Sequence, residues 1–160
     1  MNPFSIFANM KMEIKWDDSS FDKWKYRSPK QVEIDKKAKC NDASSYLHSI
    51  IQDSEILQFE VRKLDRSPII VRDDEKIQDK WIHNNLLFKF EGYYYIAEWM
   101  WCSSYRSIFG PFETKEEILL KFINMATVLI DNKLNDSFEI KQVVFKNPPY
   151  GITINEYQDY

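Results

Sequence analysis

The chain has 160 residues, of which 44% are hydrophobic and 29% are charged, and this balance is typical of one folded domain rather than a disordered chain. Its net charge of -3 argues against a duplex-DNA-binding protein, which gains most of its affinity from a basic face. Only three glycines occur in the chain, so a glycine-rich phosphate-binding loop is nearly excluded.

Residues 1–40 form a Lys-rich segment of less regular pattern, with nine Lys or Arg against six Asp or Glu. The alternation in residues 10–16 predicts a strand, and Pro29 is expected to block a helix and to end a loop. The chain opens without a charged leader, no apolar run is long enough to cross a membrane, and Cys40 and Cys102 are expected to be reduced. These features predict a cytoplasmic protein.

The next segments carry clearer periodicities. Residues 41–53 place apolar side chains at helical spacing, which predicts a short helix. Residues 56–64 alternate between apolar and polar side chains, which predicts a strand, and a shorter strand is expected at residues 69–72. The acidic residues 73–75 predict the start of a second short helix, since negative charge is favourable at a helix N-terminus.

The clearest feature is a hairpin over residues 86–101. Two alternating runs flank Glu91 and Gly92, and a glycine can take the positive φ that a tight turn needs. Both faces of the second run are mostly apolar, so this strand is expected to lie centrally in a sheet, covered on both sides.

The C-terminal third begins with an expected turn at residues 110–113. A Thr-x-x-Glu capping-box pattern then predicts the main core helix over residues 115–131. A final strand is predicted at 138–146, followed by an irregular tail at 147–160. Because hairpins dominate and no regular βαβ alternation occurs, the sequence predicts a single α+β domain with a mostly antiparallel sheet packed by one or two main helices.

Candidate catalytic and metal-binding residues are few. The two histidines, His48 and His83, are interpreted as structural, because no nucleophile stands beside them in the sequence. Cys102, with Arg106 nearby, is interpreted as a buried thiol rather than a reactive one. Cys40, the two histidines and Cys102 lack the paired spacing of a zinc site. The sequence therefore predicts no catalytic residue, no cofactor and no metal site.

A protein-binding surface is predicted instead. Aromatic side chains beside a polar loop and an arginine, at the far end of the hairpin, are expected to be exposed and to act as interface hot spots. Acidic side chains nearby would suit a basic partner. The residues expected to bind the partner are Asp73, Asp74, Glu75, Trp99, Trp101, Tyr105, Arg106 and Glu113.

The segment YYYIAEW, the following GPFETKEEI and the acidic, aromatic-rich composition give residues 86–131 a resemblance to immunity proteins of bacterial contact-dependent growth-inhibition and related toxin systems. The resemblance implies a cytoplasmic inhibitor that binds and neutralises a cognate toxin domain, often a nuclease, and performs no chemistry. It carries across no diagnostic residues, and it leaves the oligomeric state open.

Two other functions compete with this hypothesis. In the first, the chain is a module for single-stranded nucleic acid in which Trp24, Trp99 and Trp101 stack on bases, although the acidic body makes nucleic acid an unlikely partner. In the second, the chain is a hydrolase that uses Cys102 or His48.

Overall fold

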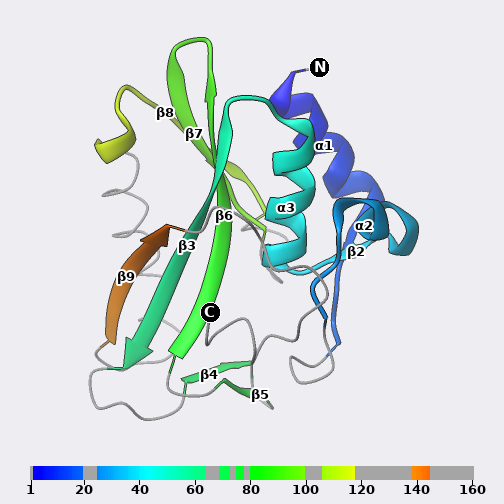
Figure 1. The fold of residues 1–160 in the computed structure, drawn as a ribbon, viewed down its shortest axis with the longest axis vertical. Coiled ribbons are helices and arrows are strands. Elements are labelled where there is room, and N and C mark those ends of the chain that lie inside the picture. Colours follow the sequence, from blue (N-terminus) through cyan, green and yellow to red (C-terminus); the bar gives the residue numbers. More distant parts are fainter. Residues whose placement is uncertain are drawn as a thin grey trace.

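The computed structural model describes residues 2–19, 25–63, 69–72, 75–77, 80–99, 106–117 and 138–144. Three helices come first, and most strands follow them (Figure 1). The helices are α1 (Pro3–Glu13), α2 (Pro29–Asp35) and α3 (Cys40–Ile50). The strands are β1 (Lys15–Trp16), β2 (Lys37–Ala38), β3 (Ser54–Lys63), β4 (Ile69–Arg72), β5 (Glu75–Ile77), β6 (Lys80–Phe90), β7 (Tyr93–Ala97), β8 (Ile108–Phe112) and β9 (Phe138–Val144).

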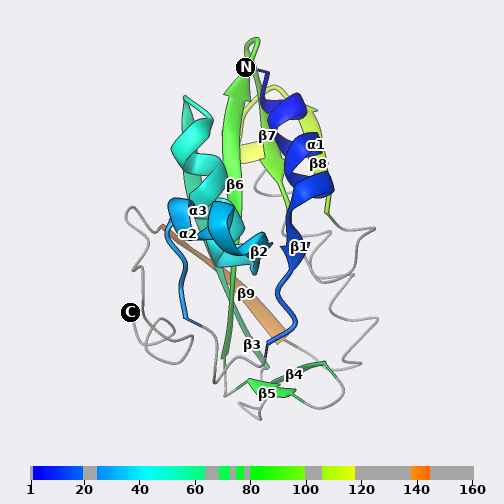
Figure 2. The same cartoon turned by 90° about the vertical axis from the view of Figure 1, so that its right-hand side faces the viewer.

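Five strands form the main sheet, in the order β8-β7-β6-β3-β9, and each neighbouring pair in it is antiparallel. The long strands β3 and β6 make its centre, while β4 pairs with β5 and β1 pairs in parallel with β2. The helices lie together on one face of the sheet (Figures 1 and 2). The α+β class predicted from the sequence is confirmed.

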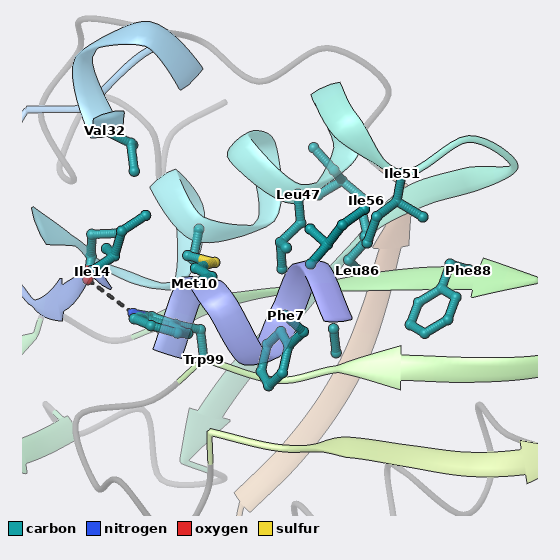
Figure 3. Packing of buried hydrophobic residues seen from close by; sticks show 14 residues of the cluster. Phe7, Met10, Ile14, Val32, Leu47, Ile51, Ile56, Leu86, Phe88 and Trp99 are labelled. Carbon is teal, nitrogen blue, oxygen red and sulfur yellow. Dashed lines mark hydrogen bonds between the residues drawn. The ribbon is translucent and has the colours of Figure 1, made fainter. Parts of the chain in front are cut away.

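The main core lies between the helices and this face of the sheet (Figure 3). Its members include Phe7 and Met10 from α1, Leu47 from α3, and Leu86 and Phe88 from β6. These side chains are nearly all buried, and burying apolar area of this kind is the main force that holds helices onto a sheet. None of the helices in the described ranges has both the length and the apolar character needed to cross a membrane.

The strand predicted for residues 10–16 is wrong, because most of that segment belongs to α1. Asn2 caps this helix by accepting a hydrogen bond from the backbone N–H of Phe4 at 2.8 Å, and Pro3 occupies the first helical position. Ile6, Phe7 and Met10 then fall on one buried face. The strand that remains, β1, is two residues long.

Pro29 starts a helix instead of blocking one. It stands at the first position of α2, where the missing N–H costs nothing, and Ser28 accepts a hydrogen bond from the backbone N–H of Gln31 at 3.2 Å. The helix predicted at 41–53 is confirmed as α3, which starts one residue earlier, at Cys40.

The helix predicted from residues 73–75 onward is wrong, because β5 and β6 occupy this part of the described chain. β6 pairs with β3 from Lys80 to Phe88, and this long antiparallel ladder outweighs the local helical pattern. The strand at 69–72 is confirmed as β4, and β3 and β9 match the strands predicted at 56–64 and 138–146.

The hairpin at 86–101 is confirmed for β6 and β7, which pair from Leu86–Ala97 to Phe90–Tyr93 around a turn where Glu91 and Gly92 take positive φ. The turn predicted at 110–113 is wrong, since Gly110 and Pro111 lie inside strand β8.

Of the helix predicted at 115–131, the structure describes only the first turn. Its backbone N–H at Glu117 donates to the Oγ1 atom of Thr114 at 3.1 Å, as a capping residue requires. The rest of this helix and the tail at 147–160 lie outside the described residues.

Candidate active site

The exposed position predicted for Trp99 is wrong. Its side chain is 1% exposed, and its ring packs edge-on against Phe7 at a centroid distance of 6.2 Å. Its indole N–H donates to the carbonyl of Ala38 at 3.1 Å (Figure 3). The guanidinium of Arg106 lies 5.2 Å from the ring centroid. Trp99 is therefore part of the core that joins the hairpin to the N-terminal helices, and it offers no surface to a partner.

The other residues of the predicted interface are not brought together in the part of the chain that can be described. Glu113 is exposed after β8, and Arg106 is partly buried. Glu75 belongs to β5, and only its backbone is described. Four further residues of the predicted interface lie wholly outside the described residues: Asp73, Asp74, Trp101 and Tyr105.

A buried pair of charged residues lies where β6 and β7 separate. His83 is on β6, and Glu98 follows β7 directly, one residue beyond the Leu86–Ala97 pair. The Nε2 atom of His83 lies 2.6 Å from the Oε1 atom of Glu98. His83 is 6% exposed and Glu98 is 3% exposed. The short helix predicted to start at residues 73–75 does not form around His83, which lies inside a strand.

The Glu98 carboxylate is held by two further hydrogen bonds. The side-chain amide of Asn85 donates to its Oε2 atom at 2.5 Å, and the backbone N–H of Trp99 donates to its Oε1 atom at 2.9 Å. The Glu98 backbone also exchanges hydrogen bonds with that of Ser107, at 2.9 and 3.2 Å. A buried carboxylate needs such donors, and together they fix the direction in which it faces His83.

Cys40 completes this cluster. It is the first residue of α3, is 4% exposed, and lies beside His83. Burial alone would lower the pKa of His83, but the charges of Glu98 and Cys40, together with the hydrogen bond to Glu98, raise this pKa to about 10. His83 therefore holds its proton at neutral pH. In the described arrangement the Cys40 thiol donates to the Oδ1 atom of Asn41 at 3.0 Å.

The start of α3 is fixed in place by a network of charges. Asp42, in the first turn, accepts hydrogen bonds from the backbone N–H groups of Lys39 at 3.1 Å and Arg27 at 2.7 Å. The Arg27 guanidinium reaches Asp42 at 3.3 Å, Asp17 at 2.6 Å and Asp35 at 2.9 Å. These bonds tie the first turn to two preceding segments, so the position of Cys40 is defined by more than its own contacts.

At Asp17 the hydrogen bonds of this network together affect the pKa more than burial does. Burial works to raise the pKa of Asp17, but hydrogen bonds from Ser19 and Arg27 lower it below its usual value. Lys39 is fully buried next to it, and its ammonium donates to the carbonyls of Asp17 at 2.9 Å and Ser19 at 2.7 Å.

The arrangement of Cys40, His83 and Glu98 matches the requirements of nucleophilic catalysis. A thiol lies beside a basic side chain, and a third group, whose own position is fixed, orients that base. His48, by contrast, is exposed on α3 and contacts Ser54. Cys102 lies outside the described residues, and among the side chains that are described no group of His, Cys, Asp and Glu could hold a metal ion.

Comparisons of the sequence with models of protein families and with curated proteins returned no match. The candidate site is therefore argued from the structure, without support from relatives. Sequence reasoning missed it because its three members come from separate segments. Two local signals point to it: a cysteine at the very start of a helix, and the polar run His83-Asn84-Asn85 between apolar residues of a strand.

Proposed function

We propose that this protein is a thiol-dependent enzyme that transfers acyl groups, with Cys40 as nucleophile, His83 as acid and base, and Glu98 as the group that orients His83. The observation that carries the proposal is the convergence of these three buried side chains from α3, β6 and the end of β7. A protonated imidazole next to a cysteine is the setting in which the nucleophilic thiolate is stabilised.

The proposed reaction has two stages. The Cys40 thiolate adds to the carbonyl carbon of an amide or ester, and His83 gives its proton to the leaving amine or alcohol as the C–N or C–O bond breaks. This leaves the acyl group on Cys40 as a thioester. Water or an amine then attacks the thioester, His83 accepts a proton from it, and the Cys40 thiolate leaves, which restores the starting state.

Each supporting residue has a defined part in this scheme. Since Glu98 bonds to Nε2, the other ring nitrogen of His83, Nδ1, is the one that would exchange a proton with Cys40 or with the substrate. Asn85 and the backbone N–H of Trp99 keep the carboxylate pointed at the ring. Burial excludes bulk water, which strengthens each of these electrostatic interactions.

The test uses p-nitrophenyl acetate, a simple activated ester, and the two cysteines of the chain. We expect the full chain and its Cys102→Ala variant to hydrolyse the ester, and the Cys40→Ala variant to lose at least nine-tenths of that rate, an order-of-magnitude expectation for loss of a nucleophile. Activity that survives in Cys40→Ala, or that is lost only in Cys102→Ala, would contradict the proposal.

Binding and neutralisation of a toxin domain in the cytoplasm is the second proposal, and it is favoured by the exposed acidic residues Glu113 and Glu116 after β8. The two proposals separate in the Cys40→Ala variant, since removing a buried thiol leaves this surface unchanged. Neutralisation that is equal in both proteins, with no ester hydrolysis in either, would favour the binding function. Base stacking by Trp99 has no support, because its ring is buried.

A further inference from the structure

The side-chain amide of Asn41 is a buried donor next to the Cys40 sulfur. Asn41 is fully buried, and its Oδ1 atom lies 3.0 Å from the Cys40 Sγ atom. Its Nδ2 atom belongs to the same planar amide, one bond angle away from the oxygen that faces the sulfur. Within the described part of the chain, this Nδ2 has no hydrogen-bond partner. A buried amide without a partner is uncommon and needs a reason.

The backbone of Asn41 is held firmly in place. Its carbonyl accepts hydrogen bonds from the Tyr26 hydroxyl at 2.8 Å and from the Ser45 hydroxyl at 3.0 Å, and those two hydroxyls are themselves 2.6 Å apart. Asn41 also stands in the first turn of α3, where the helix dipole favours a negative charge nearby. The amide is thus a preorganised donor in an environment that favours an anion.

We infer that Asn41 Nδ2 donates a hydrogen bond to the oxyanion that forms when the thiolate adds to a carbonyl. This inference rests on the proposed acyl transfer at Cys40. When sulfur adds to the carbonyl carbon, the C=O bond opens and its oxygen takes the negative charge. This oxygen is two bonds from the sulfur, so it forms next to the side-chain amide that contacts that sulfur. The hydrogen bond from the Asn41 amide to the oxyanion lasts only until the C=O bond re-forms and the leaving group departs.

Two reactions of the same thiol separate this function from a structural one. Acylation by p-nitrophenyl acetate passes through an oxyanion, whereas alkylation by iodoacetamide displaces iodide at carbon and forms none. We expect Asn41→Ala to slow acylation of Cys40 by about 100-fold or more, the usual effect of removing one oxyanion donor, and to change alkylation less than about threefold. Asn41→Leu keeps a similar volume and adds no charge beside the sulfur, so it provides a second variant without the amide donor.

Each outcome decides the inference. A large loss of acylation with nearly unchanged alkylation in both variants supports it. Equal slowing of both reactions would show that Asn41 only maintains the site, and unchanged acylation would show that its amide is not used; either result overturns the inference while leaving the proposed function standing. If the unmodified chain is never acylated at Cys40, the proposed function fails, and this inference falls with it.

Discussion

The Nε2 atom of His83 lies 2.6 Å from the Oε1 atom of Glu98, in a region from which solvent is almost fully excluded. The pair couples protonation to stability. Because the folded pKa of His83 is raised to about 10 from its ordinary 6.5, its contribution to the free energy of unfolding is complete below pH 6.5 and is lost as the pH rises through about 10.

Replacing Glu98 with Gln removes the larger of the two charges that raise this pKa. Burial then lowers the pKa of His83 against the smaller effect of Cys40, so the decline in stability between pH 6.5 and about 10 should become much smaller. At neutral pH the variant should also be about 3 kcal/mol less stable than the unmodified chain, because a buried pair is broken. Urea unfolding across this pH range measures both effects, with His48→Gln as control because His48 is exposed. An unchanged slope in Glu98→Gln would exclude the coupling.

Arg27 is expected to hold the start of α3 in place. Replacing it with Ala removes the guanidinium that pairs with the fully buried carboxylate of Asp42, so the free energy of unfolding should fall by about 3 kcal/mol. The matched control is Asp35→Asn, which removes the more exposed partner of the same guanidinium and should cost less than about 1 kcal/mol. Chemical denaturation measures both; equal small losses would show that the network does not anchor the helix.

Trp99 should behave as a core residue. Trp99→Phe removes the indole N–H that bonds to the Ala38 carbonyl and leaves a small cavity against Phe7, for an expected loss of about 2 kcal/mol. Substituting the exposed Tyr93 with Phe should change stability by less than about 0.5 kcal/mol. Thermal unfolding compares the two variants. A loss of stability in Trp99→Phe as small as that in Tyr93→Phe would contradict the burial of the Trp99 ring.

The two glycines of the described chain should respond differently to Ala. At Gly110, with a φ of 137°, an added Cβ would lie 2.6 Å from the Tyr95 Cδ1 atom and 2.8 Å from the Tyr94 carbonyl oxygen. Strain and clash should then cost about 3 kcal/mol. At Gly92 the added Cβ meets open space, so only the positive φ of 86° is penalised, at about 1 kcal/mol. Differential scanning calorimetry should rank them in this order; the reverse order would contradict the packing of β8 against β7.

Local patterns predicted the elements that local interactions define. The β6–β7 hairpin follows from alternation around Glu91 and Gly92, and α3 follows from its apolar stripe and early polar residues. α1 was missed because its cap depends on Asn2, which precedes a segment that also alternates. β6 begins at Lys80, earlier than the predicted hairpin at residue 86, because its first residues pair with β3. No local pattern reveals that pairing.

The candidate site lay beyond sequence reasoning for the same reason. Cys40, His83 and Glu98 come together only when α3 packs on β6 and β7 pairs beside it. In the sequence, Glu98 is a polar residue within an aromatic run, and nothing local distinguishes it, while Trp99 beside it is predicted to be exposed. Which of two alternating faces is covered depends on the helices that arrive from elsewhere in the chain, here α1 and α3.

The most direct test of acyl transfer at Cys40 is to locate the acyl group itself. The full chain is exposed briefly to p-nitrophenyl acetate, quenched in acid, digested and mapped by mass spectrometry. We predict an acetyl thioester on the peptide that contains Cys40, retained in Cys102→Ala and strongly reduced in His83→Ala. A folded chain that carries no acetyl group on Cys40, or carries it equally without His83, would contradict the assignment of this site.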